Sequence, residues 1–220
     1  MVVLHHSVNH QLFADDTQLQ KSAPLSEVTS LTKELNACTD DIKTWMMKNQ
    51  LKLKNNKTEA LLFPFSSSLK PSTVPLPDSI TLGSHNIPFS YSARSLGFIL
   101  DSKLSMKKHV IQICPTAYFE LKRIRSIRRF LTEDVVKTLV ISYILLLLDY
   151  CNCLLMGTSN SVIQPLQKIQ NFAARLVLLA PSNHHSTPLL EKLHWLPISE
   201  RIKSLVCVLC YKWFWSCLTL

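Results

Sequence analysis

The sequence predicts an α+β fold, with a helix and short strands before about residue 100 and helices alone after it. Two observations lead to this prediction. In the first half, one long helical pattern is surrounded by short apolar segments bounded by turn residues, which is typical of strands. From about Ser105 onward, apolar residues recur every three or four positions, which is typical of helices. The change near residue 101 divides the chain into two predicted domains, 1–100 and 101–220.

The first predicted elements are a hairpin and a helix. In the segment LFADDTQL (residues 12–19), apolar residues stand on both sides of two adjacent acids, which favours two strands joined by a tight turn. A helix is expected next, ending near Lys48 and Asn49, because apolar residues follow at helical spacing. These residues are Leu25, Val28, Leu31, Leu35, Cys38, Ile42 and Trp45.

Several short strands are expected in the rest of the first half. They are separated by residues that favour turns, and the serine- and proline-rich segment 66–77 between them is predicted to be a loop. The candidate strands are 51–53, 60–63, 80–82, 87–89 and 95–100.

Five helices are expected in the second half. Thr132 is a candidate N-cap for the second of them, and Thr187-Pro188 opens a short fourth. The first helix should bury one face, made of Val110, Ile113, Ala117, Leu121 and Ile124. The other helices are expected at 135–148, at about 162–176, after Thr187, and from 198 to about 213.

Composition narrows the class of function. Three glycines in 220 residues argue against a glycine-built phosphate cradle, so dinucleotide and Walker-type sites are not expected. The net charge of +9 favours a polyanionic partner, with nucleic acid first and an acidic membrane surface second. The apolar run 138–156 is interrupted by Ser142, Asp149 and Asn152, which favours a buried helix followed by a turn over a membrane span.

Cysteine usage and the N-terminus bear on the compartment. Seven cysteines make an odd number, and residues 1–10 lack the pattern of a secretory signal, so an intracellular protein, nuclear or cytoplasmic, is expected without disulfides. Cys207 and Cys210 have metal-like spacing and could join Cys151 and Cys153 at a zinc ion. Both pairs lie in apolar segments, which favours small buried hydrophobic residues instead.

The acids Asp15 and Asp16 are the sharpest sign of chemistry. Adjacent carboxylates on a tight hairpin can hold a hard divalent cation, although such a pair alone is more often a solvated turn. The segment Phe13–Asp16 (FADD) resembles the (Tyr or Phe)-Ala-Asp-Asp box of the reverse transcriptases of non-LTR, LINE-like retrotransposons. Further boxes resemble this family in the same order along nearly the whole chain. They are Leu51–Glu59, Arg94–Phe98, Phe130–Glu133, Leu148–Asn152, Ile169–Leu176, Leu193–Pro197 and Arg201–Lys203.

The resemblance implies an RNA-directed DNA polymerase, a nucleotidyltransferase that uses two Mg²⁺ ions on an RNA/DNA template–primer duplex. It makes residues 1–100 a partial palm and 101–220 a thumb-like helical region. Asp15 would be a metal ligand, Asp16 would support it, and Lys57 would lie near the leaving pyrophosphate. The family places another metal-bridging Asp on a strand well upstream, whereas the twelve residues before Phe13 contain no acid. The chain is therefore expected to be a fragment, inactive alone, whose missing fingers and palm could be supplied in trans.

A basic stripe is the second candidate site. If residues 101–220 are a thumb-like region, this stripe would contact the phosphates of the template–primer duplex without sequence specificity. The alternative interpretations of the stripe are a solvated helix face and a nuclear-import signal. The stripe comprises Lys107, Lys108, Lys122, Arg123, Arg125, Arg128 and Arg129. Two other readings of the chain stay open: a non-catalytic nucleic-acid-binding protein that uses these basic helices, and a translated product without a role.

Overall fold

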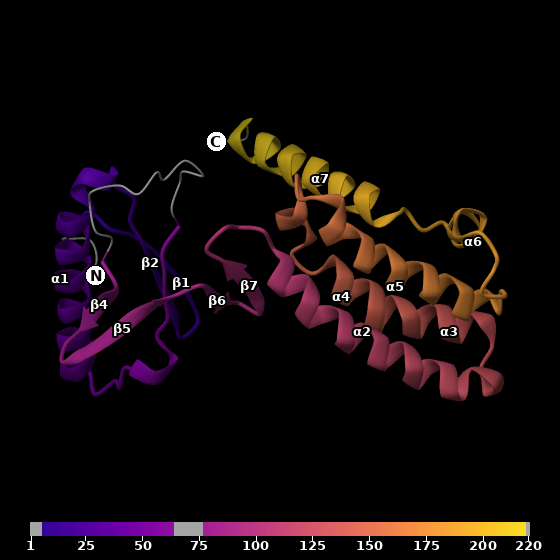
Figure 1. The fold of residues 1–220 in the computed structure, drawn as a ribbon, viewed down its shortest axis with the longest axis horizontal. Coiled ribbons are helices and arrows are strands. Elements are labelled where there is room, and N and C mark those ends of the chain that lie inside the picture. Colours follow the sequence, from indigo (N-terminus) through magenta and orange to yellow (C-terminus); the bar gives the residue numbers. More distant parts are fainter. Residues whose placement is uncertain (1–5, 64–76, 219–220) are drawn as a thin grey trace. The chain divides into compact units, whose positions relative to one another are not determined.

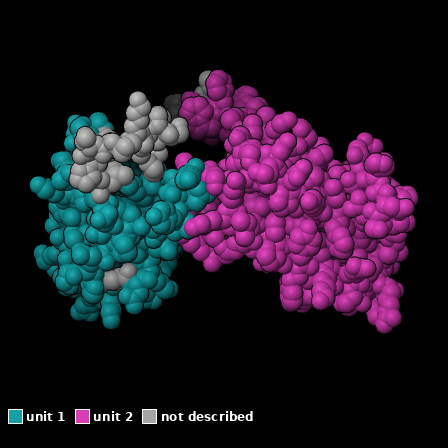
Figure 2. All heavy atoms as spheres, in the orientation of Figure 1, with its two compact units in different colours: residues 1–93, 101–103 teal, residues 94–100, 104–220 magenta. Residues whose placement is uncertain are grey.

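The computed structural model describes residues 6–63 and 77–218 and divides the chain into two compact units. The first unit takes the chain up to Ala93 together with Asp101–Lys103, and the second takes Arg94–Leu100 and the chain from Leu104 onward (Figures 1 and 2). The described chain mixes helices and short strands, so the α+β prediction is confirmed. The strands form three small sheets and not one continuous sheet.

The first unit begins with the predicted hairpin. Strands β1 (Asn9–Phe13) and β2 (Asp16–Gln20) pair antiparallel, with Phe13 opposite Asp16. The loop between them therefore has two residues, Ala14 and Asp15, and Ala14 takes the positive φ (+53°) that such short loops require. Among the described residues no third strand pairs with this hairpin.

The predicted long helix follows as α1 (Val28–Lys48) and packs on a three-stranded sheet. The sheet has the order β3-β5-β4, with β4 as an edge strand. Polar side chains of α1 cover that edge: Asn36 accepts a hydrogen bond from the Thr81 N–H at 3.0 Å, and Asp40 accepts one from the Gly83 N–H at 2.9 Å. The three strands are β3 (Ala60–Leu61), β4 (Ser79–Leu82) and β5 (His85–Ser90).

The strand predicted at Leu51–Leu53 is wrong. Gln50 adopts a positive φ (+58°), and the Leu51 N–H donates to the Met46 carbonyl at 2.8 Å. These features belong to a helix end, in which the residues after the last turn fold back to satisfy its free carbonyls. Leu51 is thus part of the C-terminal cap of α1, and a short 3₁₀ turn, Asn55–Lys57, follows. The loop predicted at 66–77 lies almost wholly outside the described residues.

The strand predicted at 95–100 is a hairpin instead. Strands β6 (Ser92–Ser95) and β7 (Phe98–Asp101) pair with each other, and Leu96 and Gly97 form the turn. Both turn residues have a positive φ, +47° and +85°, and the second value is one that glycine adopts without strain. The glycine inside the apolar segment was the sequence signal for this turn.

The second unit is a helical bundle with the main core of the protein. The α2 face predicted to be buried is confirmed at Val110, Ala117, Leu121 and Ile124, and Ile113 is half-buried against the core. Thr132 does stand at the N-cap position of the next helix, but its side chain makes no capping hydrogen bond. The helices are α2 (Lys107–Ile127), α3 (Glu133–Val140), α4 (Leu146–Asp149), α5 (Asn160–Leu178), α6 (Ser186–Leu193) and α7 (Ile198–Leu218).

The apolar run 138–156 forms a buried helix and then a turn, as predicted. A π-helical segment, Ile141–Leu145, joins α3 to α4, and a 3₁₀ turn, Asn152–Leu155, follows α4. Ile144 and Leu148 of this run are almost completely buried. In the part of the chain that the structure describes, no helix has both the length and the apolar character needed to cross a membrane.

Candidate catalytic and nucleic-acid-binding sites

The two candidate metal ligands stand at the tip of the first hairpin. Asp15 is the second residue of the two-residue loop, and Asp16 begins β2. Both side chains are exposed, and the neighbouring Phe13 is 65% exposed. The tip therefore presents carboxylate oxygens, the ligands that Mg²⁺ prefers, next to an open apolar side chain.

The carboxylate pair lacks the partners that a two-metal site needs. Within residues 6–63 and 77–218, no group of three or more His, Cys, Asp or Glu side chains could hold a metal ion. The segments outside these ranges contain no Asp or Glu at all. Lys57 is exposed on its 3₁₀ turn, and among the described residues no hydrogen bond or ion pair joins it to Asp15 or Asp16. Two carboxylates supply only part of the oxygen shell of one Mg²⁺, so the pair does not fit a two-metal centre by itself.

Most of the predicted basic stripe lies on the solvent side of α2 and its extension. Five of the cations, four on α2 and one on the 3₁₀ turn that follows it, are exposed. They are Lys107, Lys108, Lys122, Arg125 and Arg129. Arg123 is exposed as well, but it donates two hydrogen bonds to the Glu120 carboxylate, at 3.0 and 3.1 Å, which offsets its charge locally.

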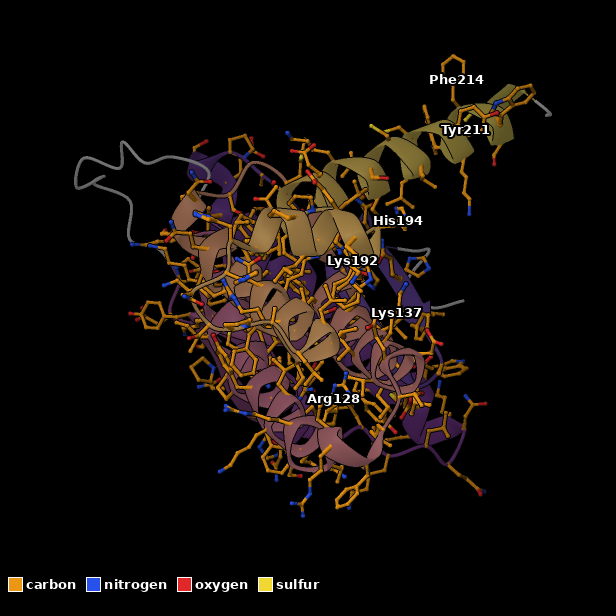
Figure 3. All side chains as sticks on the ribbon, turned by 90° about the vertical axis from the view of Figure 1, so that its right-hand side faces the viewer. Arg128, Lys137, Lys192, His194, Tyr211 and Phe214 are labelled. Carbon is orange, nitrogen blue, oxygen red and sulfur yellow. The ribbon has the colours of Figure 1, made fainter. Side chains whose placement is uncertain are left out.

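Arg128 has a different task from the rest of the stripe. Its side chain is turned into the bundle, as Figure 3 shows, and only 9% of the residue is exposed. The guanidinium donates to the carbonyls of Leu176 (3.0 Å) and Val177 (2.9 Å) in the last turn of α5, and to the carbonyl of Leu131 (2.8 Å). A buried cation at a helix C-terminus satisfies carbonyls that have no helical partner. Arg128 is therefore a structural residue of the bundle.

The sequence contained the signal that separates Arg128 from its neighbours. It follows Ile124 by four positions and Leu121 by seven, so it continues the buried face of α2 and not the exposed one. The sequence-based prediction treated the run KRIRSIRR as one group and missed this register.

Aromatic side chains accompany the exposed cations. Arg129 lies over the Phe130 ring at 4.6 Å, and Arg123 lies over Phe119 at 5.9 Å. Tyr118 and Phe119 are themselves exposed on α2. Cations that track phosphates beside rings that can stack on bases are the usual components of a surface that binds single-stranded nucleic acid.

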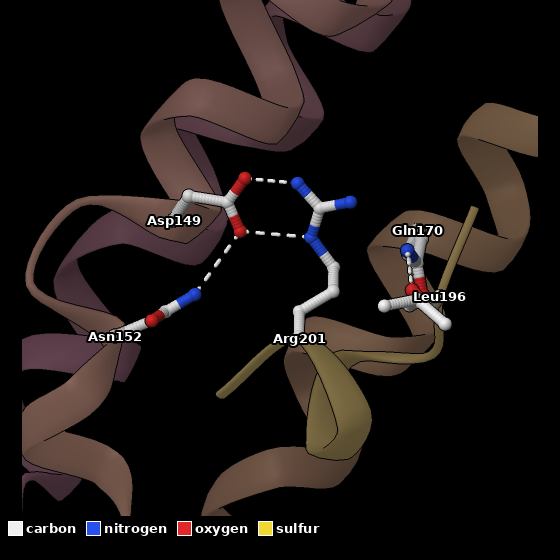
Figure 4. A network of polar contacts seen from close by, with 5 residues as sticks. All are labelled: Asp149, Asn152, Gln170, Leu196 and Arg201. Atoms are coloured by element: carbon white, nitrogen blue, oxygen red, sulfur yellow. Dashed lines mark hydrogen bonds and ion pairs between the residues drawn. The ribbon is translucent and has the colours of Figure 1, made fainter. Parts of the chain in front are cut away.

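Four boxes of the second unit meet in two sets of polar contacts, shown in Figure 4. Asp149 accepts two hydrogen bonds from Arg201, through Nε at 2.8 Å and through Nη2, and a third from Asn152 at 3.0 Å. Gln170 of α5 is fully buried and donates to the Leu196 carbonyl at 2.8 Å. Residues from four separate boxes thus fasten α4, α5 and the start of α7 together.

Two further contacts stabilise the helical unit, the first between residues next to the boxes and the second between two boxes. Gln167 accepts a hydrogen bond at 2.8 Å from the N–H of Ile198, the first residue of α7, and so satisfies one free donor of that helix. The Tyr150 hydroxyl donates to the Leu96 carbonyl in the β6–β7 turn. Within this structure the boxes that carry the resemblance hold the helical unit together, and the sequence-based prediction assigned them no such contacts.

His109 is the one buried histidine in the described chain. Its ring stacks on Phe98 at 3.8 Å, and its Nδ1 lies 3.5 Å from the Ile99 N–H. Burial lowers the pKa of His109 below its usual 6.5, because the charged imidazolium would lose its hydration. His109 is therefore a neutral part of the core at neutral pH.

The cysteines differ in burial. Cys38 is completely buried and Cys114 is half-buried, and burial raises the pKa of both thiols. Cys207 and Cys210, which were predicted to be buried hydrophobic residues, are exposed on α7, so that prediction is wrong. They lie beyond the last turn of α7 that packs on the bundle.

Comparisons with known proteins identify no relative. No model of a protein family matches the chain, and no curated protein or solved structure matches it either.

Proposed function

We propose that this chain derives from the RNA-directed DNA polymerase of a LINE-like retrotransposon and does not synthesise DNA by itself. The observation that carries the proposal is the hairpin tip. Asp15 and Asp16 are exposed on a two-residue turn, the arrangement expected for the Phe-Ala-Asp-Asp box, and no third carboxylate of the described chain joins them. Nucleotidyl transfer by two metals requires more oxygen ligands than this pair offers.

The order of the other boxes supports the same origin. Those in the second unit are separated by up to about a hundred residues, yet several of them meet through Asp149, Gln170 and Arg201. Polar side chains that depend on one another for hydrogen bonds are expected to persist together, because the loss of one leaves a buried partner unsatisfied. A set of mutually dependent boxes explains why the resemblance extends over the helical half of the chain.

Primer extension tests the catalytic part of the proposal. The purified full-length chain is incubated with a primed RNA template, deoxynucleotides and Mg²⁺, beside an intact reverse transcriptase as the positive control. No extension is expected. Synthesis by the wild-type chain that is lost in the Asp15→Asn variant would show that the site is complete and would refute the proposal.

A pull-down tests whether the chain can complete a polymerase in trans. The bait is a separately produced fingers and upstream palm fragment of a LINE-like reverse transcriptase, and the prey is the full-length chain. Binding together with restored extension is expected if the missing ligand can be supplied by a partner. A complex that forms but requires neither Asp15 nor Asp16 for extension would contradict the assigned roles.

The second candidate function is non-catalytic binding of nucleic acid. It is favoured by the five exposed cations of α2 and the 3₁₀ turn after it, and by the rings of Phe119 and Phe130 beside Arg123 and Arg129. This function needs no metal ligand and would survive the loss of catalysis. The salt dependence of duplex binding tests this function separately from primer extension.

A further inference from the structure

Two aromatic rings beside the arginines of α2 and the turn after it keep most of their surface free. Phe119 is 60% exposed and Phe130 is 71% exposed. The guanidinium groups of Arg123 and Arg129 lie 5.9 and 4.6 Å from the centres of these rings. A cation at this distance is attracted to the face of a ring and leaves the rest of the ring uncovered. Both rings therefore have open surface for a further flat partner.

A third ring lies next to the cations of the same helix. Tyr118 is 45% exposed and precedes the exposed Lys122 by four positions, and Lys122 precedes the exposed Arg125 by three. Residues three and four apart are neighbours on a helix surface, so these side chains follow one line along α2. Phe119 stands three positions before Lys122 and is its neighbour as well. Rings and cations are thus interleaved on the exposed part of α2.

Few acids oppose the charge of this surface. Residues 107–130 contain six exposed cations and a single acid, Glu120, whose carboxylate is occupied by Arg123. The next acids along the chain are Glu133 and Asp134, which begin α3 and mark the end of the basic surface. This charge is complementary to a polyanion and unfavourable for an apolar or basic partner.

We propose, on the basis of the second candidate function, that this surface binds an unpaired nucleic-acid strand in preference to a duplex. Bases of the strand stack on Tyr118, Phe119 and Phe130. Its phosphates lie at Lys122, Arg125 and Arg129. In a duplex the faces of the bases are covered by neighbouring bases, so only an unpaired strand offers them to the rings. Every base has an aromatic face, and the binding therefore does not select a sequence.

Stacking and phosphate contacts respond differently to salt. Each phosphate contact contributes about −0.7 to the slope of log K against log salt on a single strand, compared with about −0.9 on duplex DNA. Five exposed cations therefore give a slope of about −3.5 on the single strand and about −4.5 on the duplex. Stacking on a ring releases no counterions and contributes roughly 5-fold to 150-fold in affinity per base. The preference for the single strand should therefore grow as the salt concentration rises.

Fluorescence anisotropy of the full-length chain tests this preference. The probes are a labelled DNA strand of about 12 nucleotides without self-complementarity and the same strand annealed to its complement. At 200 mM potassium chloride the single strand should bind at least about 10-fold more tightly than the duplex, with the flatter salt slope. An RNA strand of the same sequence should bind as tightly as the DNA strand, because neither stacking nor a phosphate contact reads the 2′-hydroxyl.

Variants of the rings test where the bases are bound. Tyr118→Leu, Phe119→Leu and Phe130→Leu together keep apolar side chains and all charges of the surface. Single-strand affinity should fall at least about 10-fold while its salt slope and the duplex affinity stay unchanged. The matched control is Tyr143→Leu, which removes an exposed ring of the same unit away from α2 and should have no effect. Circular dichroism verifies that both variants are folded.

The measurements separate this proposal from the candidate function on which it rests. A chain that binds the duplex with the expected salt slope, but binds the single strand no more tightly or is insensitive to loss of the three rings, would overturn the proposal and leave nucleic-acid binding intact. A chain that binds neither probe, including one that binds phosphatidylserine vesicles through α2 instead, would overturn both.

Discussion

Neutralising the exposed basic face of α2 should flatten the salt dependence of duplex binding. The perturbation is the triple variant Lys122→Gln, Arg125→Gln and Arg129→Gln, which removes three of the five exposed cations. Each phosphate that a cation neutralises contributes about −0.9 to the slope of log K against log salt on duplex DNA. Five cations that all engage phosphates therefore give a slope of about −4.5, and the two that remain give about −1.8.

These slopes predict a large difference in a simple assay. Raising the salt concentration from 50 to 200 mM should weaken binding by the wild-type chain about 500-fold, but binding by the triple variant only about 12-fold. Fluorescence anisotropy of a labelled DNA duplex, titrated with protein at several potassium chloride concentrations, measures both slopes. At low salt the variant should also bind more weakly than the wild type at every sequence tested, because phosphate contacts do not select bases.

A charge-matched control separates the α2 face from net charge. The triple variant lowers the net charge of +9 by three. Replacing the exposed lysines Lys48, Lys168 and Lys192 by Gln lowers it by the same amount through residues of other helices. The control should keep the wild-type slope. The reasoning is refuted if both variants change the slope equally, or if the α2 variant leaves it unchanged.

Three further predictions follow from single side chains. Arg128→Met should lower the free energy of unfolding by about 3 kcal/mol in urea denaturation, because three carbonyls lose a charged donor, and should leave the salt slope unchanged; a stable variant with a flattened slope would contradict the structural role. Burial lowers the pKa of His109 in the folded chain, so the unfolded chain binds a proton there more readily and the free energy of unfolding should fall as the pH drops below 6.5. In thermal melts, His109→Gln should remove part of this pH dependence. A variant with the same pH dependence as the wild type would contradict the role of His109. Thiol reagents should modify the exposed cysteines of α7, which are Cys207, Cys210 and Cys217, much faster than Cys38 and Cys114. Burial raises the pKa of the Cys38 and Cys114 thiols and so disfavours their reactive thiolate form. Equal modification rates at all five cysteines would contradict the described burial.

Where local patterns decide the conformation, the sequence was a good guide. The helix α1 and the buried face of α2 follow from apolar spacing, and the first hairpin follows from two acids between apolar residues. The wrong strand predictions at Leu51 and at Leu96-Gly97 also have local causes. Leu51 forms part of a helix end and Leu96-Gly97 forms a two-residue turn, although both lie in apolar segments that resemble strands. Both structures could have been predicted from the sequence by considering helix ends and two-residue turns as alternatives to a strand.

The candidate site was predictable only in part. Spacing and charge identified Asp15, Asp16 and the basic stripe, since these features lie within a few residues of one another. Spacing could not show that the guanidinium of Arg128 reaches carbonyls 48 and 49 residues away in α5. It also could not show that Asp149, an isolated acid in an apolar run, faces Arg201.

The sequence by itself determined which segments are helical, which faces of them are apolar, and where cations and paired carboxylates occur, because these properties depend on neighbours along the chain. Only the tertiary structure decided which polar side chains are used internally and which remain exposed. Whether a buried polar group is stable depends on partners that packing brings from distant segments, such as Gln170 with Leu196, and not on the residues beside it. The exposed second half of α7 has the same cause, since its apolar residues lie beyond the reach of the helices that bury the first half.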